Sequence, residues 1–275
     1  MRCRARLASA AITLALYGAV LAVLAFFYLP ILALMMFSFT ASRLPTLPVA
    51  DWTLAWYAAL LARGDLWPAL ANTAALATLT TGIATALGVG GAVAWTRYRF
   101  RFKRLFQALA IAPLAFPQIL LGIALLLWIS VAGAWLGVGT SLAAAVLGNV
   151  VHATPFALVI VALQRHGLDQ TLEDAARDAG ASPRQVFLNV TWPLMRPGVS
   201  VAAVFVFLSS WGNFHVTYNL AGGATTLPTF VYSGLAAGST PVYPALATLT
   251  FVPALGLLAL AEWRRRRGAG RGSRR

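Results

Sequence analysis

Long apolar stretches separated by short polar segments dominate the chain. A stretch of about 20 apolar residues is long enough to cross a bilayer as a helix, and a helix satisfies its own backbone hydrogen bonds there. Six such stretches lie at 10–39, 69–95, 105–132, 140–164, 198–221 and 242–263. The fifth is the most polar, because it contains Ser209, Ser210, Asn213, His215 and Asn219. The pattern predicts an all-α membrane protein with six transmembrane helices.

Proline and small residues inside these stretches indicate how the helices pack. Prolines within the spans suggest kinks that neighbouring helices cover; they are Pro30, Pro113, Pro117, Pro155 and Pro253. The second span is rich in small residues, which allow close approach of two helices. These residues are Gly82, Ala84, Ala86, Gly88, Gly90 and Gly91.

The charges orient the predicted helices. Only 10% of the residues are charged, against about 25% in a soluble domain. All of the 21 basic residues except Arg43 and Arg63 lie before the first span, between spans two and three, between spans four and five, or after span six. The positive-inside rule makes that side cytoplasmic. Both termini are therefore expected inside, which requires an even number of spans.

This reading divides the chain into a basic cytoplasmic N-terminus at 1–9, a membrane domain at 10–263 and a basic cytoplasmic tail at 264–275. The basic start followed by an apolar run is similar to a signal peptide. The apolar run exceeds the roughly 7–15 residues of a cleavable core, so we expect an uncleaved first span. The net charge of +14 is then explained by the basic residues of the cytoplasmic side, and nucleic acid is not an expected partner.

The chain lacks the sequence motifs of several other classes of protein. The only lysine, Lys103, follows Phe102, so the chain has no P-loop. The single cysteine, Cys3, allows no disulfide framework, and the three histidines are scattered, which gives no metal signature. An ion-coupled secondary transporter remains an alternative, although its usual intramembrane carboxylates are missing. A channel also remains open on composition.

The segment Gly167–Gly198, between spans four and five, is the one sizeable polar stretch and reads as two short helices. Thr171 with Asp174, and Ser182 with Gln185, have the spacing of capping boxes, and Gly180 is placed to end the first helix. An apolar stripe at helical spacing follows Leu172, Ala175, Ala176 and Ala179, and a second one follows Val186, Phe187 and Val190. The stripe must be buried, against a partner, under the chain's own bundle or in the membrane interface.

This segment resembles the cytoplasmic signature of permease subunits of binding-protein-dependent ABC importers. That signature reads E-A-A, three residues, G, nine residues, I-x-L-P. The matching positions here are Asp174, Ala175, Ala176, Gly180, Val190, Trp192 and Pro193. The chain departs from it with Asp174 for Glu, Val190 for Ile and Trp192 for Leu. Segments at 66–95 and 112–122 resemble further parts of the same family.

The resemblance implies a cytoplasmic coupling helix pair between helices four and five that sits in a cleft of a separate ATPase dimer. Ala175 and Ala176 would face the ATPase, and Asp174 would accept polar contacts at the helix start, where the helix dipole favours an acid. Gly180 would let the chain reverse, and Pro193 would end the second helix. ATP and magnesium would bind to the ATPase, so this chain needs no cofactor or catalytic residue of its own. A soluble binding protein and a second permease subunit complete the implied complex in a bacterial inner membrane.

The C-terminal third is similar to the spermidine/putrescine branch of the family, through Thr226–Ser233, Gly238–Pro241 and Ala245–Leu249. That similarity favours a different second permease over another copy. Where the branch has S-L-D-D-F, this chain has Ser210-Trp211-Gly212-Asn213-Phe214, without the two carboxylates. The expected substrate is therefore polyamine-like or a related small organic solute. Polar and aromatic residues of the spans are candidates for its path, namely Gln118, His152, Trp211, Asn213, His215, Tyr218 and Asn219. The alternatives are hydrogen bonds between helices for the polar residues and anchors at the membrane interface for the aromatic ones.

Overall fold

The computed structural model describes residues 2–42, 51–169, 171–238, 241–252 and 256. The chain divides into two compact units, one of residues 64–232 and one of residues 1–63 with 233–275. Helices dominate both units, and the strand-like pairing within the described residues is an isolated bridge between Thr40 and Trp52. Five helices among these residues are long and apolar enough to cross a membrane. The predicted all-α membrane class is confirmed.

Three predicted spans are single helices in the structure, with bounds that differ somewhat from those of the apolar stretches. They are α1 (Arg2–Phe37), α3 (Leu66–Arg97) and α6 (Leu142–His166). The sixth predicted span begins with a shorter apolar helix, Val242–Val252. Its continuation at 253–255 and 257–263, with Pro253, lies outside the described residues, as does the basic tail at 264–275. The count of six spans therefore stays a prediction.

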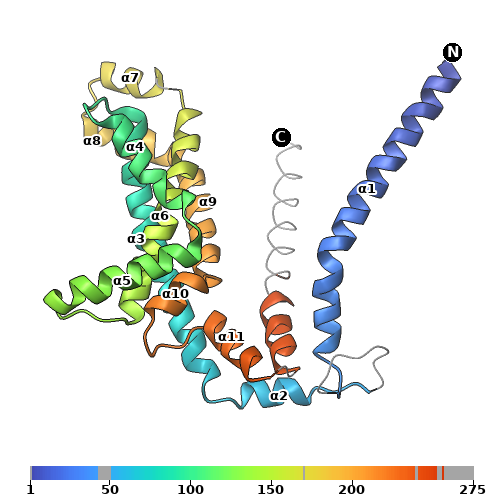
Figure 1. Cartoon of the computed structure of the whole chain (residues 1–275). Coiled ribbons are helices and arrows are strands. Elements are labelled where there is room, and N and C mark those ends of the chain that lie inside the picture. The colour runs from blue at the N-terminus through green and yellow to red at the C-terminus, as the bar shows by residue number, and fades with distance from the viewer. Residues whose placement is uncertain (1, 43–50, 170, 239–240, 253–255, 257–275) are drawn as a thin grey trace. The chain divides into compact units, whose positions relative to one another are not determined.

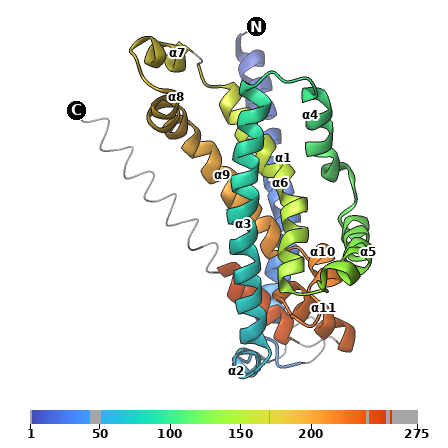
Figure 2. The same ribbon diagram turned by 90° about the vertical axis from the view of Figure 1, so that its left-hand side faces the viewer.

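Helices α3, α6 and α9 (Trp192–Trp211) pack side by side and form the core of the unit 64–232 (Figure 1, Figure 2). Buried alanines and valines fill the space between them. The closest approach is at Gly88, where an added Cβ would lie 2.5 Å from Cβ of Ala157. A Cβ at Gly90, two residues further on, would meet nothing within 4 Å. Small residues thus allow close packing on one side of α3, as the sequence predicted.

The third predicted span, 105–132, is not one helix. It is divided into α4 (Lys103–Ile111), a 3₁₀ turn (Ala112–Ala115) and α5 (Gln118–Leu136). Pro113 and Pro117 supply no N–H for the helix, and Phe116 is extended with ψ 131°, as expected of a residue before proline. Only α5 has the length and hydropathy of a span. The expected kink is therefore a complete break.

The fifth predicted span, 198–221, is also divided. Helix α9 ends at Trp211, Gly212 follows, and a short helix α10 (His215–Leu220) continues the chain. The side-chain Oδ1 of Asn213 accepts a hydrogen bond of 3.2 Å from the N–H of Val216. This contact satisfies a backbone donor at the start of α10 and competes with continued helix. The polar residues that weaken the hydropathy of this span thus mark its break.

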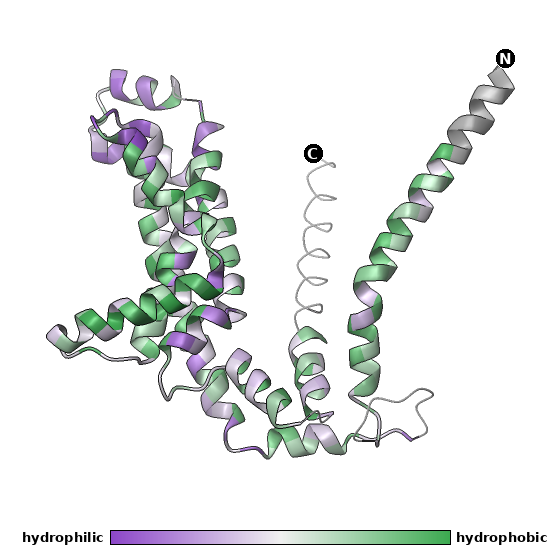
Figure 3. Ribbon diagram, viewed as in Figure 1, coloured by the Kyte–Doolittle hydropathy of each residue, from purple (hydrophilic) through white to green (hydrophobic). Residues whose placement is uncertain are grey.

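In the unit of residues 1–63 and 233–275, the described side chains of α1 from Ile12 to Leu29 are all exposed. The segment after α1 folds back onto the short helix α2 (Ala55–Leu61). The hydroxyls of Ser38 and Tyr57 lie 2.6 Å apart, and the indole N–H of Trp56 donates to the carbonyl of Thr40 at 2.7 Å. Helix α11 (Leu227–Ala237) contains a boundary between the units. Figure 3 shows that α1 is strongly hydrophobic, whereas α7 is hydrophilic.

Candidate functional site

Two short helices stand at one end of the unit 64–232, where its hydrophilic residues are concentrated (Figure 3). They are α7 (Thr171–Asp178) and α8 (Pro183–Val186). The carboxylate of Asp169 accepts a hydrogen bond of 2.9 Å from the N–H of Thr171 at the start of α7. At α8, the capping box of Ser182 and Gln185 forms as the sequence predicted. The helix pair expected in the polar segment is present.

Gly180 ends α7 in the way its position predicted. Its φ of +86° is in the left-handed region that favours glycine. Its N–H donates to the carbonyl of Arg177 at 2.8 Å, and the N–H of Ala181 donates to the carbonyl of Ala176 at 3.0 Å. These two bonds form a Schellman motif, which satisfies the last carbonyls of the helix. The motif turns the chain directly towards Ser182 and α8.

The second helix does not stop at Pro193, and that prediction was wrong. A π-helical turn (Phe187–Thr191) joins α8 to α9, so helix runs from Pro183 to Trp211. Pro193 lies in the first turn of α9 and has no N–H to donate to the turn before it. The π-helical turn, with i to i+5 hydrogen bonds, lies directly before α9. Val190 lies half-buried within this turn, and α8 continues through it into a membrane-length helix.

Glu173 is the residue that ties α7 to the bundle, and the sequence interpretation missed it. It is 6% exposed although it is charged. Its Oε1 lies 3.1 Å from both terminal nitrogens of Arg165, in the last turn of α6, and accepts a hydrogen bond of 2.7 Å from the hydroxyl of Thr191. Its Oε2 lies 3.6 Å from Arg97, the last residue of α3, and 3.3 Å from Arg177. One carboxylate thus connects α7 with α3, α6 and the turn that leads into α9.

The surroundings of Glu173 favour its ionised form. Burial raises the pKa of its carboxyl group, but the hydrogen bond from Thr191 and the charges of Arg165 and Arg97 lower it, and the net pKa lies below its usual value of 4.5. A buried carboxylate with three guanidinium partners and a hydroxyl donor is well compensated. The site is therefore an ionic anchor.

Asp174, which the signature selected, does not anchor the helix. Its side chain is exposed and pairs with Arg177 at 2.6 Å within α7 itself. Glu173, the preceding residue, points towards the bundle instead, because adjacent residues on a helix do not share a face. A possible signal for Glu173 was its spacing of four residues from Arg177, which is typical of a helical ion pair.

The apolar stripe of α7 is not buried under the chain's own bundle. Leu172 is 49% exposed, Ala175 is exposed and Ala176 is half-buried. On the second helix, by contrast, Val186 is completely buried. The unit 64–232 therefore fixes α7 through its charged side and leaves its apolar side accessible.

Two of the predicted substrate-path residues come together where the third span breaks. Nε2 of His152, on α6, lies 3.0 Å from Nε2 of Gln118, the first residue of α5. One turn earlier on α6, Asn149 donates to the hydroxyl of Thr217 on α10 at 3.1 Å. Asn149 and His152 are buried and three residues apart, so they share one face of α6. This face, called the polar seam below, meets both broken spans.

The remaining candidates gather around α10. Asn219 donates to the carbonyl of His215 at 2.7 Å, and a Cβ at Gly122 of α5 would lie 2.9 Å from both of the atoms in that bond. Asn213 is buried at the break, as described above. Helix α10 therefore approaches α5 closely beside the polar seam.

The expected aromatic group is only partly correct. The rings of Phe214 and Tyr218 lie 5.1 Å apart, but Trp211 packs against Phe207 at 5.6 Å. Tyr232 of α11 joins the group, at 4.6 Å from Phe214 and 5.7 Å from Tyr218. Tyr218 and Tyr232 are both more than half exposed. Within the described part of the chain, no three His, Cys, Asp or Glu residues are placed to hold a metal ion.

A bundle of membrane-length helices with a short helix pair fixed to its polar end is the architecture of a transporter permease. Solved structures share this fold. A bacterial alginate ABC transporter, solved with a periplasmic protein that holds an alginate pentasaccharide, aligns with a TM-score of 0.70 over 92% of this chain and 94% of that chain, at 16% identity. The MetNI methionine ABC transporter aligns with a TM-score of 0.57 over 77% of this chain and 97% of that chain, at 24% identity.

The family described as the binding-protein-dependent transport system inner membrane component matches residues 82–263, so the chain belongs to that family. The putrescine transport system permease protein PotI of Escherichia coli strain K12 is 31% identical over 86% of this chain and 85% of its own length. The spermidine/putrescine transport system permease protein PotC of the same strain is 29% identical over 89% of this chain and 91% of its own length. The molybdenum transport system permease protein ModB of Haemophilus influenzae is 33% identical over 62% of this chain and 82% of its own length.

The chain is therefore a permease subunit of a binding-protein-dependent ABC importer in the inner membrane, similar to the polyamine permeases. The predicted family and class of function are confirmed. The family assignment replaces the ion-coupled alternative. The roles of individual residues in the segment 171–193 remain predictions.

Proposed function

We propose that this permease couples ATP hydrolysis in a separate cytoplasmic ATPase to solute movement through the segment 171–193. The observation that carries the proposal is the two-sided character of α7. Its apolar side, with Leu172 and Ala175, is exposed. Its opposite side is held by Glu173 on the ends of the membrane helices. An exposed apolar face on a rigidly held helix suits a docking contact that transmits force.

The transmission path follows from the contacts of Glu173. A displacement of α7 acts on Arg165 at the end of α6, and on Thr191 in the turn that leads into α9. Both helices belong to the packed core, and packed cores move as bodies because they deform little. Movement of the ATPase surface is thereby converted into movement of α6 and α9. The small, exposed side chain of Ala175 permits the close approach that such docking needs, whereas Ala176 is half-buried on the side of Glu173.

The proposed complex contains an ATPase dimer that binds ATP and magnesium, a second permease subunit and a soluble substrate-binding protein. Both termini of this chain and the segment 171–193 lie on the side of the ATPase. The family name and the periplasmic protein in the alginate transporter support the binding protein. The resemblance of the C-terminal third to the spermidine/putrescine branch favours a second permease that differs from this chain.

We further propose a small organic solute, polyamine-like or related, as the substrate. PotI and PotC are named for putrescine and spermidine. Because Gly212 and Asn213 replace a pair of acids, recognition here relies on neutral groups: the polar seam and the exposed rings of Tyr218 and Tyr232. Aromatic faces attract organic cations without a carboxylate. ModB, named for molybdenum, has a similar identity, so a substrate assay has to decide.

The test is uptake of labelled putrescine into proteoliposomes that contain the whole complex, with binding protein present. We expect uptake to require ATP on the side of the membrane where the ATPase is bound. Uptake should persist when the proton and sodium gradients are collapsed. Uptake that needs a gradient and proceeds without ATP would contradict the proposed coupling. ATP-dependent uptake of another solute in place of putrescine would leave the coupling intact and contradict only the substrate.

A further inference from the structure

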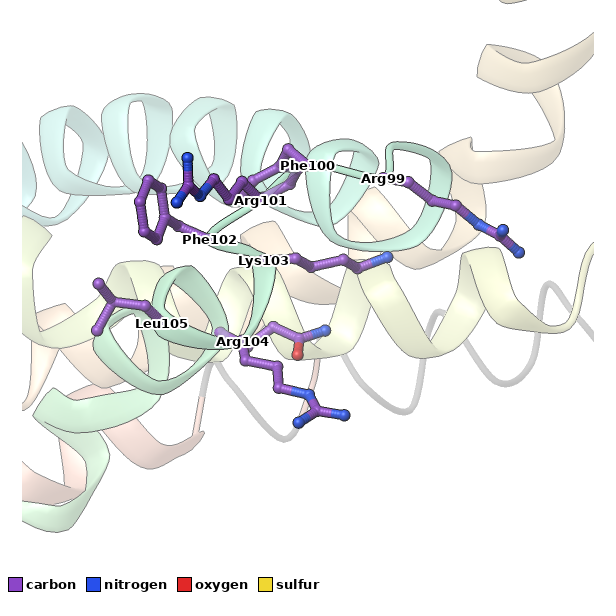
Figure 4. A pocket seen from close by; sticks show the side chains of 8 residues that line it. Arg99, Phe100, Arg101, Phe102, Lys103, Arg104 and Leu105 are labelled. Carbon is purple, nitrogen blue, oxygen red and sulfur yellow. The ribbon is translucent and has the colours of Figure 1, made fainter.

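A group of four cations surrounds the loop that joins α3 to α4, at the same end of the unit as α7. They are Arg99, Arg101, Lys103 and Arg104, and exposed aromatic residues alternate with them in the loop. Together with Leu105 and Gln107 they line an open hollow of about 730 Å³. Figure 4 shows their side chains leaving the loop in several directions, with Arg101 beside the ring of Phe102. We call this set of four residues the basic rim.

The basic rim has no anionic partner among the residues that the structure describes. Arg97, just before it, pairs with Glu173, but none of the four lies within 4.0 Å of a carboxylate of the described chain. Lys103 donates to the carbonyl of Tyr98 at 3.1 Å, and Arg101 lies 5.6 Å from the centre of the Phe102 ring. Four neighbouring cations repel one another, and an anion bound at this loop would lower that repulsion.

The apolar and aromatic side chains beside the basic rim are also exposed. Phe102 and Leu109 are each 64% exposed, and Tyr98 is 56% exposed. Helix α4 contains no buried residue. The rim directly follows the end of α3, a helix of membrane length, and so lies at the bilayer boundary. Aromatic and basic side chains are both favoured at that depth.

We propose that the basic rim binds the head group of an anionic phospholipid, whose acyl chains lie along the exposed apolar residues of α4. A phosphodiester supplies the missing negative charge, and guanidinium groups match its oxygens in geometry. Clusters of basic residues directly beside a membrane helix attract anionic lipids in this way. An acidic protein surface would match the charges but would leave Phe102, Leu105 and Leu109 exposed. The site is independent of the coupling proposed for α7.

The experiment is native mass spectrometry of the purified full chain with dioleoylphosphatidylglycerol or dioleoylphosphatidylcholine, which share acyl chains. The wild type is expected to retain the anionic lipid preferentially. In Arg101→Gln/Arg104→Gln, affinity for it falls about thirtyfold at low ionic strength, since each basic residue near an anionic lipid contributes about 1 kcal/mol. Arg101→Lys/Arg104→Lys keeps both charges but loses the guanidinium geometry, so its affinity falls less than that of the Gln variant and the preference for phosphatidylglycerol persists. All of these side chains are at the surface, so folding is retained.

The matched control is Arg184→Gln/Arg196→Gln, which removes two exposed charges from the segment around α8 and α9. This control keeps the preference for phosphatidylglycerol. Equal loss in both double variants would show that total charge, and not the basic rim, attracts the lipid, and would overturn the proposal. An unchanged preference for phosphatidylglycerol in Arg101→Gln/Arg104→Gln would show that the basic rim does not bind the lipid, and would also overturn the proposal.

Discussion

Oε1 of Glu173 accepts a hydrogen bond of 2.7 Å from the hydroxyl of Thr191, and both residues are almost completely buried. The bond joins α7 to the π-helical turn from which α9 continues into the membrane domain. Because Arg165 and Arg97 share the same carboxylate, four segments meet at one side chain. A displacement of α7 therefore acts on the bundle through an ionic anchor.

Removal of the charge of Glu173 should release α7 while the bundle remains folded. In Glu173→Gln, the guanidinium of Arg165 stays buried without its anion, which costs about 3 kcal/mol, the low end for a broken buried pair. Hydrogen exchange of the α7 amides should accelerate accordingly, with α6 unchanged. Asp174→Asn, which breaks an exposed pair in the same helix, should cost less than about 1 kcal/mol. Equal acceleration in both variants would show that Glu173 is not the anchor.

The anchor should also weaken in acid. The pKa of Glu173 is lower in the folded protein than its usual 4.5, so the folded state binds fewer protons than the unfolded chain does. The stabilisation is complete above pH 4.5 and is lost as the pH falls through the lowered pKa. Hydrogen exchange of α7, corrected for intrinsic rates, should show the loss.

Asp169 at the start of α7 requires a control in that experiment. The hydrogen bond from the N–H of Thr171 lowers the pKa of its carboxyl group too. The Glu173→Gln variant should therefore keep only the acid effect that comes from Asp169. An undiminished effect in that variant would assign the pH dependence to Asp169.

The helix pair was predictable from the sequence, but its anchor was not. Capping at Ser182 and reversal at Gly180 depend on residues within a few positions of each other. The burial of Glu173 depends on Arg97 and Arg165, which belong to other helices and are brought to it by the packing of α3 and α6. A local pattern cannot distinguish Glu173 from Asp174 when distant residues decide which of them is buried.

Two glycines of α3 provide a matched test of helix packing. Gly88→Ala places a Cβ 2.5 Å from that of Ala157, so the helices must separate, at a typical overpacking cost of about 1–3 kcal/mol. Gly90→Ala meets nothing within 4 Å and should stabilise the helix by about 0.5–1 kcal/mol. Unfolding of the purified protein by a denaturing detergent measures both. The same sign for the two variants would contradict the close contact of α3 and α6.

The polar contact of Gln118 with His152 should be a modest interaction between helices. A double-mutant cycle with Gln118→Ala and His152→Ala is expected to give a coupling of about 0.6 kcal/mol, the average for such bonds in membranes. Transport is the second measurement. If both residues contact the substrate, each single variant raises the KM for uptake even though the variant protein remains folded. An unchanged KM would restrict the pair to a packing role.

The spans were predictable as apolar stretches, whereas their breaks were only partly so. Pro113 and Pro117 predicted a kink in the third span, but hydropathy alone could not show that the span divides into α4 and α5 there. At Gly212 the break arises from the bond between Asn213 and the N–H of Val216, which a count of polar residues does not reveal. Tyr232 joined the aromatic group from a separate helix, and this also required the fold.

The coupling role of α7 is tested most directly at Gly180. A side chain there meets nothing within 4 Å of its Cβ in this chain, and Asp and Asn tolerate the left-handed backbone better than other residues do. We compare Gly180→Asp with Gly180→Asn at wild-type expression in the membrane and measure copurified ATPase and ATP-dependent uptake. We predict that Gly180→Asp stays in the membrane but loses both the copurified ATPase and ATP-dependent uptake. Normal transport by Gly180→Asp at normal expression would contradict the proposed coupling.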